Sequence, residues 1–313
     1  MLGFIIRRIL ATIPVMGIVA LFVFSLLYIA PGDPAVVIAG DQATPQDVER
    51  IRTALGLDRP FLERFAEWSW RILHFDLGTS MFTGMPVTKL IGQRIEPTLS
   101  LMIITLILAI VIAVPMGVVA AWKAGSWIDR ALMGFAVFGF SVPVFVVGYV
   151  LAYVFALELE WLPVQGYTPF SAGLWPWFEN LILPSIALGF VYIALIARTT
   201  RAAMLEVLSQ DYVRTARAKG LGEGGILFLH ALKNAAVPIV TVIGIGVALL
   251  IGGAVVTESV FAIPGLGRLT IDAILRRDYP LIQGIVLMFS MVYVLVNLAV
   301  DVVYTLMDPR IRY

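Results

Sequence analysis

Few residues of this chain have types and spacings that could carry out chemistry on a substrate. The sequence has no cysteine and only two histidines, His74 and His230, which excludes disulfides, thiolate metal ligands and a histidine-rich metal centre. The serines considered as nucleophiles, Ser141, Ser185 and Ser259, have no histidine at a matching predicted depth. We therefore predict no catalytic residue and no metal site.

Phosphate-binding and ion-coupling patterns are also weak. The glycines at 220, 222, 224 and 225 cluster, but no Lys-Ser or Lys-Thr follows at the spacing of a phosphate-binding loop. Gly244 and Gly246 lie in an apolar run and indicate close helix packing. The carboxylates nearest to apolar runs, Glu258 and Asp301, lie toward the ends of those runs, which gives ion-driven transport little support. The energy for any transport must then come from another subunit.

The composition places the elements in a membrane. The chain has 313 residues, of which 60% are hydrophobic and 14% charged, whereas soluble domains have about 45–50% and about 25%. The net charge of +1 gives no indication of nucleic-acid binding. A spanning helix needs about 20 apolar residues, and six stretches qualify: 9–30, 99–121, 131–156, 180–197, 237–256 and 283–307. We predict an all-α polytopic protein, and the first run is long enough for a retained span rather than a signal peptide.

Lysine and arginine positions predict the orientation. The N-terminus, loops 122–130 and 198–236, and the C-terminal tail together carry twelve of these residues. The opposite short loops, 157–179 and 257–282, carry three. Because positive loops stay in the cytoplasm, both termini are expected there. The chain thus divides into residues 1–30 with the first span, an extracytoplasmic segment 31–98, and a five-helix core 99–313.

The extracytoplasmic segment has helix signals of its own. Thr44 to Asp47 reads as an N-cap, a proline at the first helical position and a following acid, with Gly56 as the stop. A second, amphipathic helix is expected near Pro60, with Phe61, Phe65, Trp68 and Leu73 on one side. Those aromatics favour packing on the protein or a place at the membrane interface. A lid on the spans and a contact with an outside partner both remain open.

The stretch 211–238, DYVRTARAKGLGEGGILFLHALKNAAVP, combines a short basic helix with a second amphipathic one. The first is expected over 212–219 and ends at Gly220; the second runs into Pro238 and the next span. Such an arrangement would act as a lever that carries movement into the membrane. It fits either a helix docked in a groove of a soluble partner or a basic anchor on anionic lipid.

This stretch resembles the EAA loop of ABC importer permeases, in the form shown by the dipeptide/oligopeptide/nickel family. Arg214-Thr215-Ala216 stands at the small-residue triplet and Gly220 at the fixed glycine, although Arg214 departs from the general glutamate. Motifs along the whole chain look like the first permease subunit of that family, similar to dipeptide permease B: MLGFIIRRIL at the start, PGDPA at 31–35, LGLDRP at 55–60, HALKNA at 230–235, ESVFAIPGLGRL at 258–269, RDYPLIQG at 277–284 and DPRIRY at the end.

The resemblance implies a six-helix, type I ABC importer fold in the cell inner membrane, surrounded by lipid. It also implies a second homologous permease, two ATPase subunits and an extracytoplasmic substrate-binding protein as partners, and no nucleic acid. ATP and magnesium would bind in the ATPase subunits, with no cofactor and no enzymatic activity in this chain. The expected ATPase contact consists of Arg214, Thr215, Ala216, Arg217, Lys219, Gly220 and Leu221.

A second segment, between the last two spans, is expected to line or close the pathway. It has an apolar stretch with a Pro-Gly turn, and its candidate residues are Glu258, Phe261, Pro264, Gly265 and Gly267. Irregular backbone at membrane depth must be buried in protein or line a cavity. A gate and a plug packed on the partner permease are both consistent with this pattern.

The resemblance implies di- or oligopeptides as cargo. Nickel, glutathione, opines, oligosaccharides or another small solute are alternatives within the same permease class. A non-transport membrane enzyme would need clustered polar residues that the sequence lacks, and a scaffold subunit would leave the extracytoplasmic and C-terminal motifs without a role.

Overall fold

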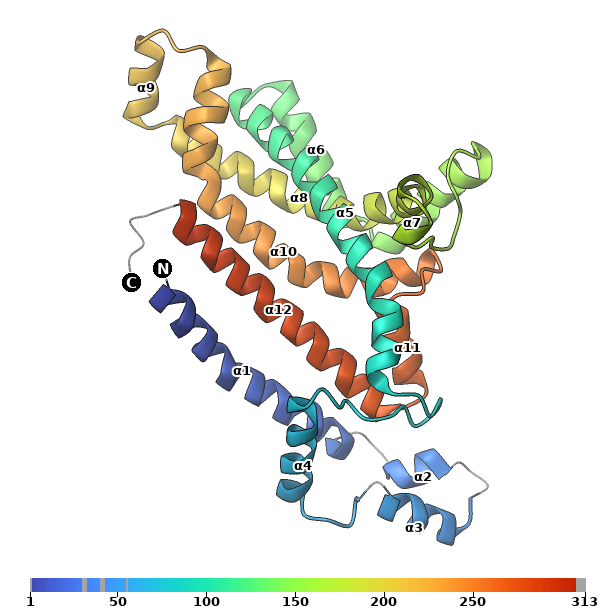
Figure 1. Ribbon diagram of the computed structural model, residues 1–313. Coiled ribbons are helices and arrows are strands. Elements are labelled where there is room, and N and C mark those ends of the chain that lie inside the picture. Colours follow the sequence, from blue (N-terminus) through green and yellow to red (C-terminus); the bar gives the residue numbers. More distant parts are fainter. Residues whose placement is uncertain (1, 30–32, 40–42, 55, 308–313) are drawn as a thin grey trace. The chain divides into compact units, whose positions relative to one another are not determined.

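The computed structural model describes residues 2–29, 33–39, 43–54 and 56–307, which are helical almost throughout (Figure 1). Its helices follow in the order α1 (Leu2–Ile29), α2 (Pro34–Ala39), α3 (Pro45–Ala54), α4 (Phe61–Leu73), α5 (Val87–Trp122), α6 (Trp127–Ser141), α7 (Val144–Leu151), η1 (Ala152–Glu158), η2 (Phe170–Ala172), α8 (Leu174–Leu208), α9 (Asp211–Ala218), η3 (Gly225–Ala231), α10 (Leu232–Val260), α11 (Leu266–Leu275) and α12 (Tyr279–Met307). No strand occurs in these ranges beyond an isolated bridge between Thr79 and Pro86. The predicted all-α class is confirmed.

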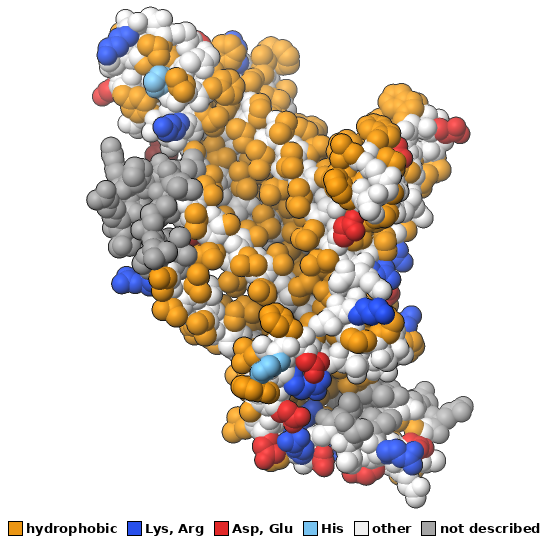
Figure 2. All heavy atoms as spheres, in the orientation of Figure 1, with side chains coloured by type: hydrophobic (Ala, Val, Ile, Leu, Met, Phe, Trp, Pro, Cys, Tyr) orange, Lys and Arg blue, Asp and Glu red, His pale blue; other side chains and the backbone are white. Residues whose placement is uncertain are grey.

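Five of the described helices are long and apolar enough to cross a membrane, and a bent pair can supply a sixth span. The five cover Ile6–Ile29, Val87–Trp122, Leu174–Leu208, Ala236–Val260 and Tyr279–Tyr304. α5 begins at Val87, so the last residues of the predicted extracytoplasmic segment belong to a span helix. Hydrophobic side chains cover the visible surface of these helices in Figure 2, while charged side chains gather around α9 and around α3 and α4.

The third predicted span, 131–156, is a bent pair of helices rather than one continuous helix. α6 and the α7–η1 stretch meet at 104° across Val142 and Pro143. Val142 has the extended backbone angles φ −99° and ψ 124°. Because a proline removes an N–H donor and pushes the preceding residue out of the helical region, the helix ends at Ser141 and restarts after Pro143.

The chain divides into two compact units, which we describe separately. One comprises residues 97–267 and 296–307 of the described chain, and the other comprises 2–96 and 268–295. In the first unit, α8 packs against α6, α7 and α10, and it buries Leu188, Tyr192 and Ile196. A Cβ atom at Gly246 would lie 2.6 Å from the Tyr192 ring. The glycines predicted to allow close helix packing therefore do so.

A partly buried ion pair joins α6 to α8 in this unit. Arg201 Nε and one terminal nitrogen donate to the two carboxylate oxygens of Asp129 at 2.5 and 2.8 Å. Asp129 also accepts from the backbone N–H of Gly125 at 2.9 Å. The paired geometry compensates for the loss of water around the carboxylate.

Replacing Arg201 by methionine should leave the Asp129 carboxylate without its charged partner, at a cost of about 3 kcal/mol, the lower end of the range for a buried pair, because Arg201 is partly exposed and the Gly125 N–H remains. Thermal unfolding of the purified transporter complex would show this as a clear loss of stability. Arg198→Met, at an exposed position of the same helix, is the matched control. The double variant Arg201→Met/Asp129→Leu should recover most of the loss, and a double variant no more stable than Arg201→Met would contradict the assignment.

The second unit contains both helices that the sequence predicts between the first and second spans. Thr44 and Asp47 form a reciprocal cap, since Asp47 N–H donates to Thr44 Oγ1 at 3.3 Å and Thr44 N–H donates to Asp47 Oδ2 at 3.2 Å. α3 then runs to Ala54, and Gly56 follows with a φ of +62°. α4 lies beside the C-terminal half of α1 (Figure 1). This helix therefore packs on the first predicted span.

Candidate functional site

The short helix α9 presents most of the predicted ATPase-contact residues on its surface. Val213 is its one buried residue, and the helix packs on η3. Asp211 lies in the first turn and Arg217 in the last, where their charges interact favourably with the helix dipole and stabilise the helix. The residues Arg214, Thr215, Arg217, Lys219, Gly220 and Leu221 are exposed, and Ala216 is half-buried.

Gly220 ends α9 in a geometry that requires glycine. Its φ is +81°, a left-handed conformation that costs other residues roughly 1–2 kcal/mol. The N–H of Gly220 donates to Arg217 O at 2.9 Å, and the N–H of Leu221 donates to Ala216 O at 3.3 Å. These two bonds form a Schellman cap, which turns the chain sharply between α9 and the following segment.

Ion pairs organise the charged surface of this turn. Arg217 binds Glu223 through two contacts of 2.9 and 3.3 Å, which ties the end of α9 to the segment after Gly220. Arg214 lies 3.4 Å from Asp211 within the helix and remains largely exposed. The surface therefore offers guanidinium and ammonium groups at fixed positions for a partner.

The segment after the turn connects α9 to the spans. η3 is a π-helix that buries Ile226, Leu227 and Ala231, and it continues directly into α10. These helices share an apolar cluster with α5 and α8, formed by Val118, Ala121, Ala203, Met204, Leu227, Ala231, Ala235 and Ile239. The predicted amphipathic helix is thus present in π form, and it connects α9 by close packing to three spans.

The second candidate segment, after α10, is a tightly packed turn. Glu258 is fully buried, and its Oε1 accepts from Thr98 Oγ1 at 2.5 Å. The same Thr98 oxygen accepts from the N–H of Leu266 at 2.8 Å. One hydroxyl therefore joins α5 to both sides of the turn.

Glycines at this turn leave room for the Glu258 carboxylate. A Cβ at Gly265 would lie 2.2 Å from Glu258 Oε1, and a Cβ at Gly267 would lie 2.5 Å from the Val255 Cα. Phe261 is buried against Gly148, and its carbonyl accepts from Gly166 N–H at 2.9 Å. Of the five predicted pathway residues, four are buried and Pro264 is half-buried, so they pack on the chain's own helices.

Sequence reasoning did not identify Thr98 as the partner of Glu258. The two residues are separated by 160 positions, and a threonine at the start of an apolar run is common. The Thr-Leu-Ser that follows Pro97 carries no local signal of this contact.

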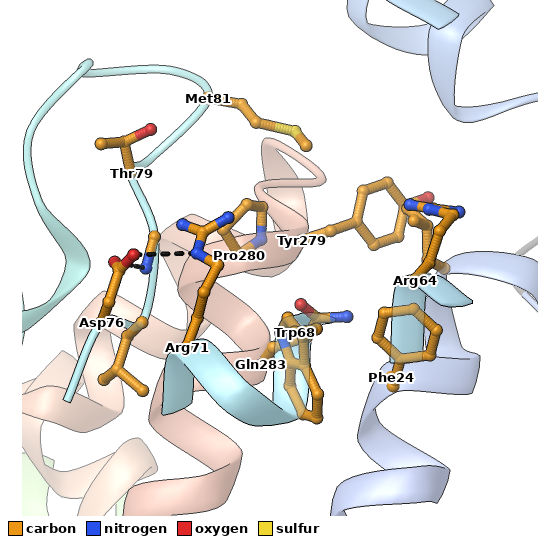
Figure 3. A pocket seen from close by; sticks show the side chains of 13 residues that line it. Phe24, Arg64, Trp68, Arg71, Asp76, Thr79, Met81, Tyr279, Pro280 and Gln283 are labelled. Atoms are coloured by element: carbon orange, nitrogen blue, oxygen red, sulfur yellow. Dashed lines mark hydrogen bonds and ion pairs between the residues drawn. The ribbon is translucent and has the colours of Figure 1, made fainter. Parts of the chain in front are cut away.

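A hollow of about 290 Å³ with apolar and charged lining residues lies in the second unit, between α1, α4 and the start of α12 (Figure 3). Arg71 donates to Asp76 at 2.8 Å, and this bond together with the N–H of Gly78 lowers the pKa of the Asp76 carboxyl. Arg64 lies above the rings of Phe24 and Tyr28, 5.7 and 5.3 Å from their centroids. With Arg64, Arg71 and Asp76 in its lining, the hollow can accept charged groups. Its lining residues do not form a nucleophile–base arrangement for bond cleavage.

The residues first considered for chemistry are dispersed. His74 is exposed at the end of α4, with Nδ1 2.8 Å from Trp70 O, and His230 is half-buried in η3. Ser141 and Ser259 donate to backbone carbonyls of their own helices. Within the described residues, no group of three His, Asp or Glu side chains could hold a metal ion.

Known families account for nearly the whole chain. The inner membrane component of binding-protein-dependent transport systems matches residues 113–313, and the N-terminal membrane component of such systems matches residues 1–102. The chain therefore belongs to this family of ABC importer permeases and is a multi-pass inner-membrane permease subunit. Such subunits work with ATP-hydrolysing subunits and a substrate-binding protein.

Individual relatives are similar over their full length. A probable peptide ABC transporter permease protein of Sinorhizobium fredii (strain NBRC 101917 / NGR234) is 56% identical over 310 residues, which is 99% of both chains. A putative peptide transport system permease protein of Brucella abortus (strain 2308) is 46% identical over 313 residues, the whole of both chains. The glutathione transport system permease protein GsiC of Escherichia coli (strain K12) is 43% identical over 313 residues, again the whole of both chains.

A solved structure shares the fold. The MetNI methionine ABC transporter, in an inward-facing conformation, superimposes with a TM-score of 0.59 at 18% identity. The match covers 71% of this chain and 97% of that one. The predicted ABC importer permease architecture is confirmed.

Proposed function

We propose that this chain forms half of the membrane pathway of an importer for di- and oligopeptides. Two permeases named for peptide transport, at 56% and 46% identity over essentially the whole chain, support this cargo. A homologous second permease would complete the pathway, and a substrate-binding protein would deliver the peptide from outside. Both termini of this chain lie in the cytoplasm in this proposal, as its lysine and arginine distribution indicates.

The observation that carries the coupling proposal is the exposed, rigidly capped helix α9. Its Schellman turn and the Arg217–Glu223 pair hold the contact residues in one orientation, and η3 joins it to the spans. ATP and magnesium would bind in two ATPase subunits, one of which contacts α9, and this chain itself performs no catalysis. ATP-driven movement of that subunit would change which side of the membrane the pathway faces, provided that α9 is bound differently in the two states.

Glutathione is the second candidate cargo, because the Escherichia coli glutathione permease is 43% identical over the whole chain. Glutathione is itself a modified tripeptide, so the two proposals differ in the substrate-binding protein more than in the pathway. Nickel or another small solute, or a scaffold without transport, has no comparable support.

Uptake measurements distinguish these cargoes. Cells that lack this gene, with the neighbouring transporter genes intact, should lose most accumulation of labelled di- and tripeptides and recover it when the gene is returned. Labelled glutathione and nickel are measured in parallel. Loss of glutathione uptake alone would assign glutathione as the cargo in place of di- and oligopeptides. Normal uptake of all peptides tested would overturn the peptide proposal.

A further inference from the structure

The extracytoplasmic helix α4 has more apolar surface than its packing within the chain covers. Successive residues of a helix lie about 100° apart, so positions three and four apart share a face. Phe61, Phe65 and Trp68 share the face that packs on α1, where their rings lie 5.3, 5.5 and 5.2 Å from the centroid of Phe24. This face anchors the helix to the outer end of the first span.

A second apolar strip on the same helix is open. Leu62 and Leu73 share one line along the helix, and Trp70 borders it; the exposed fractions of the three are 76%, 73% and 65%. Phe75, just beyond the helix, is 85% exposed and has a φ of +61°. Four large apolar side chains over 14 positions form a patch of the kind that marks an interaction surface.

The remaining faces of α4 are polar. Glu67 lies on the side away from Leu62 and Leu73, whereas Glu63 lies next to Trp70 at the edge of the strip; the two bind Arg59 at 2.8 and 3.6 Å. Arg64 and Arg71 line the hollow of Figure 3, next to the packed face. In Figure 2, hydrophobic side chains follow the left edge of this region, and charged side chains face the viewer. The exposed surface of α4 therefore has an apolar side, suited to an apolar environment, and a charged side, suited to water.

The first span provides the argument for lipid as that apolar surrounding. α1 is a candidate membrane helix of which only 11% of the apolar window is buried within this chain, with Ile18, Phe22 and Ile29 exposed along it. α4 packs on the outer end of α1 through Phe24 and Tyr28. The exposed apolar surface of α1, which we expect to face lipid, therefore extends to Phe24 and Tyr28, where α4 packs. Tryptophan at the edge of the strip suits the boundary between hydrocarbon and headgroups.

We propose that the open strip of α4 (Leu62, Trp70, Leu73 and Phe75) inserts into the outer leaflet of the membrane. The Arg59–Glu67 side faces water, and the hollow lined by Arg64 and Arg71 stays above the hydrocarbon. The insertion holds the extracytoplasmic segment flat against the membrane beside the first span. This inference does not depend on the cargo.

The absence of cysteine from the chain allows a direct test. Single variants Leu62→Cys, Leu73→Cys and, as a control on the charged side, Glu67→Cys are labelled with a nitroxide in the complete transporter. The complexes are reconstituted in vesicles of phosphatidylethanolamine and phosphatidylglycerol, and relaxation by oxygen is compared with relaxation by a water-soluble nickel chelate. The complex without an introduced cysteine supplies the background, and peptide uptake confirms that each variant is assembled.

Labels at positions 62 and 73 should be several-fold more accessible to oxygen than to the nickel chelate, and the label at 67 should show the reverse. Accessibility of positions 62 and 73 to the nickel chelate would overturn the proposal in favour of an aqueous surface. Protection from both reagents would overturn it in favour of a protein partner on the strip. Either outcome leaves the peptide-import proposal intact, since uptake is measured separately.

Discussion

Replacing Gly220 by valine should abolish most peptide uptake while the transporter still assembles. The left-handed backbone at this position, with a φ of +81°, costs a β-branched residue about 1–3 kcal/mol. No other atom lies within 4 Å of a Cβ added here, so the strain is in the turn rather than in the packing of the spans. The chain relieves it by changing the angle between α9 and η3, which misplaces the contact with the ATPase.

Uptake of labelled dipeptide and ATP hydrolysis by the purified complex measure this effect together. We expect uptake to fall at least about tenfold, the equivalent of about 1.4 kcal/mol in coupling, while ATP hydrolysis no longer responds to the loaded binding protein. Gly224→Val is the matched control, because Gly224 has helical backbone angles and open space around it. Unchanged uptake in Gly220→Val, or equal losses in both variants, would remove α9 from the coupling path.

Replacing Gly265 by alanine should have the largest effect on folding and activity in the second candidate segment. The added Cβ would lie 2.2–2.5 Å from the three carboxylate atoms of Glu258, and Glu258 is held by Thr98 in a buried site. Overpacking a core usually costs about 1–3 kcal/mol, and displacement of the carboxylate adds the cost of a lost buried hydrogen bond. Both the amount of transporter in the membrane and its melting temperature should fall.

The double variant Gly265→Ala/Glu258→Ala tests the cause. It removes the atoms that the new methyl group would meet, so it should be more stable than the single variant Gly265→Ala. Gly134→Ala, in open space on α6, should leave the melting temperature unchanged. A Gly265→Ala transporter as stable as the wild type would show that this turn is not packed as described.

The turn also bears on how the pathway opens. Because Thr98 links α5 to Glu258 on α10 and to Leu266 at the start of α11, these three elements move together as long as both hydrogen bonds persist. The sequence is consistent with a gate or with a plug packed on the partner permease. In either role the segment would act as a rigid turn, because Phe261 and Gly265 are buried.

Much of the fold could be predicted because its signals are local. A run of about 20 apolar residues is decisive by itself, and the cap formed by Thr44 and Asp47 depends on four consecutive positions. The end of α9 was predictable for the same reason, since a glycine after a short polar helix commonly takes the left-handed conformation. These features need no knowledge of what packs against them.

The features that sequence reasoning missed depend on distant partners. Pro143 alone is compatible with a mild kink, because neighbouring groups can satisfy the carbonyls it frees; the 104° bend is a property of the folded unit. Asp129 and Arg201 are 72 positions apart, and Thr98 and Glu258 are 160 apart. A single sequence gives no means of pairing them. The π-form of η3 likewise has no distinctive residue pattern.

Transport by the purified complex in proteoliposomes tests the central claim most directly. The vesicles contain this chain, its partner permease and the ATPase subunits, with ATP supplied on the α9 side and the binding protein and labelled dipeptide on the other. The account predicts accumulation of dipeptide on the ATP side, loss of accumulation without ATP, and its loss in Gly220→Val. Accumulation that persists without ATP, or that is unaffected by Gly220→Val, would contradict coupling through α9.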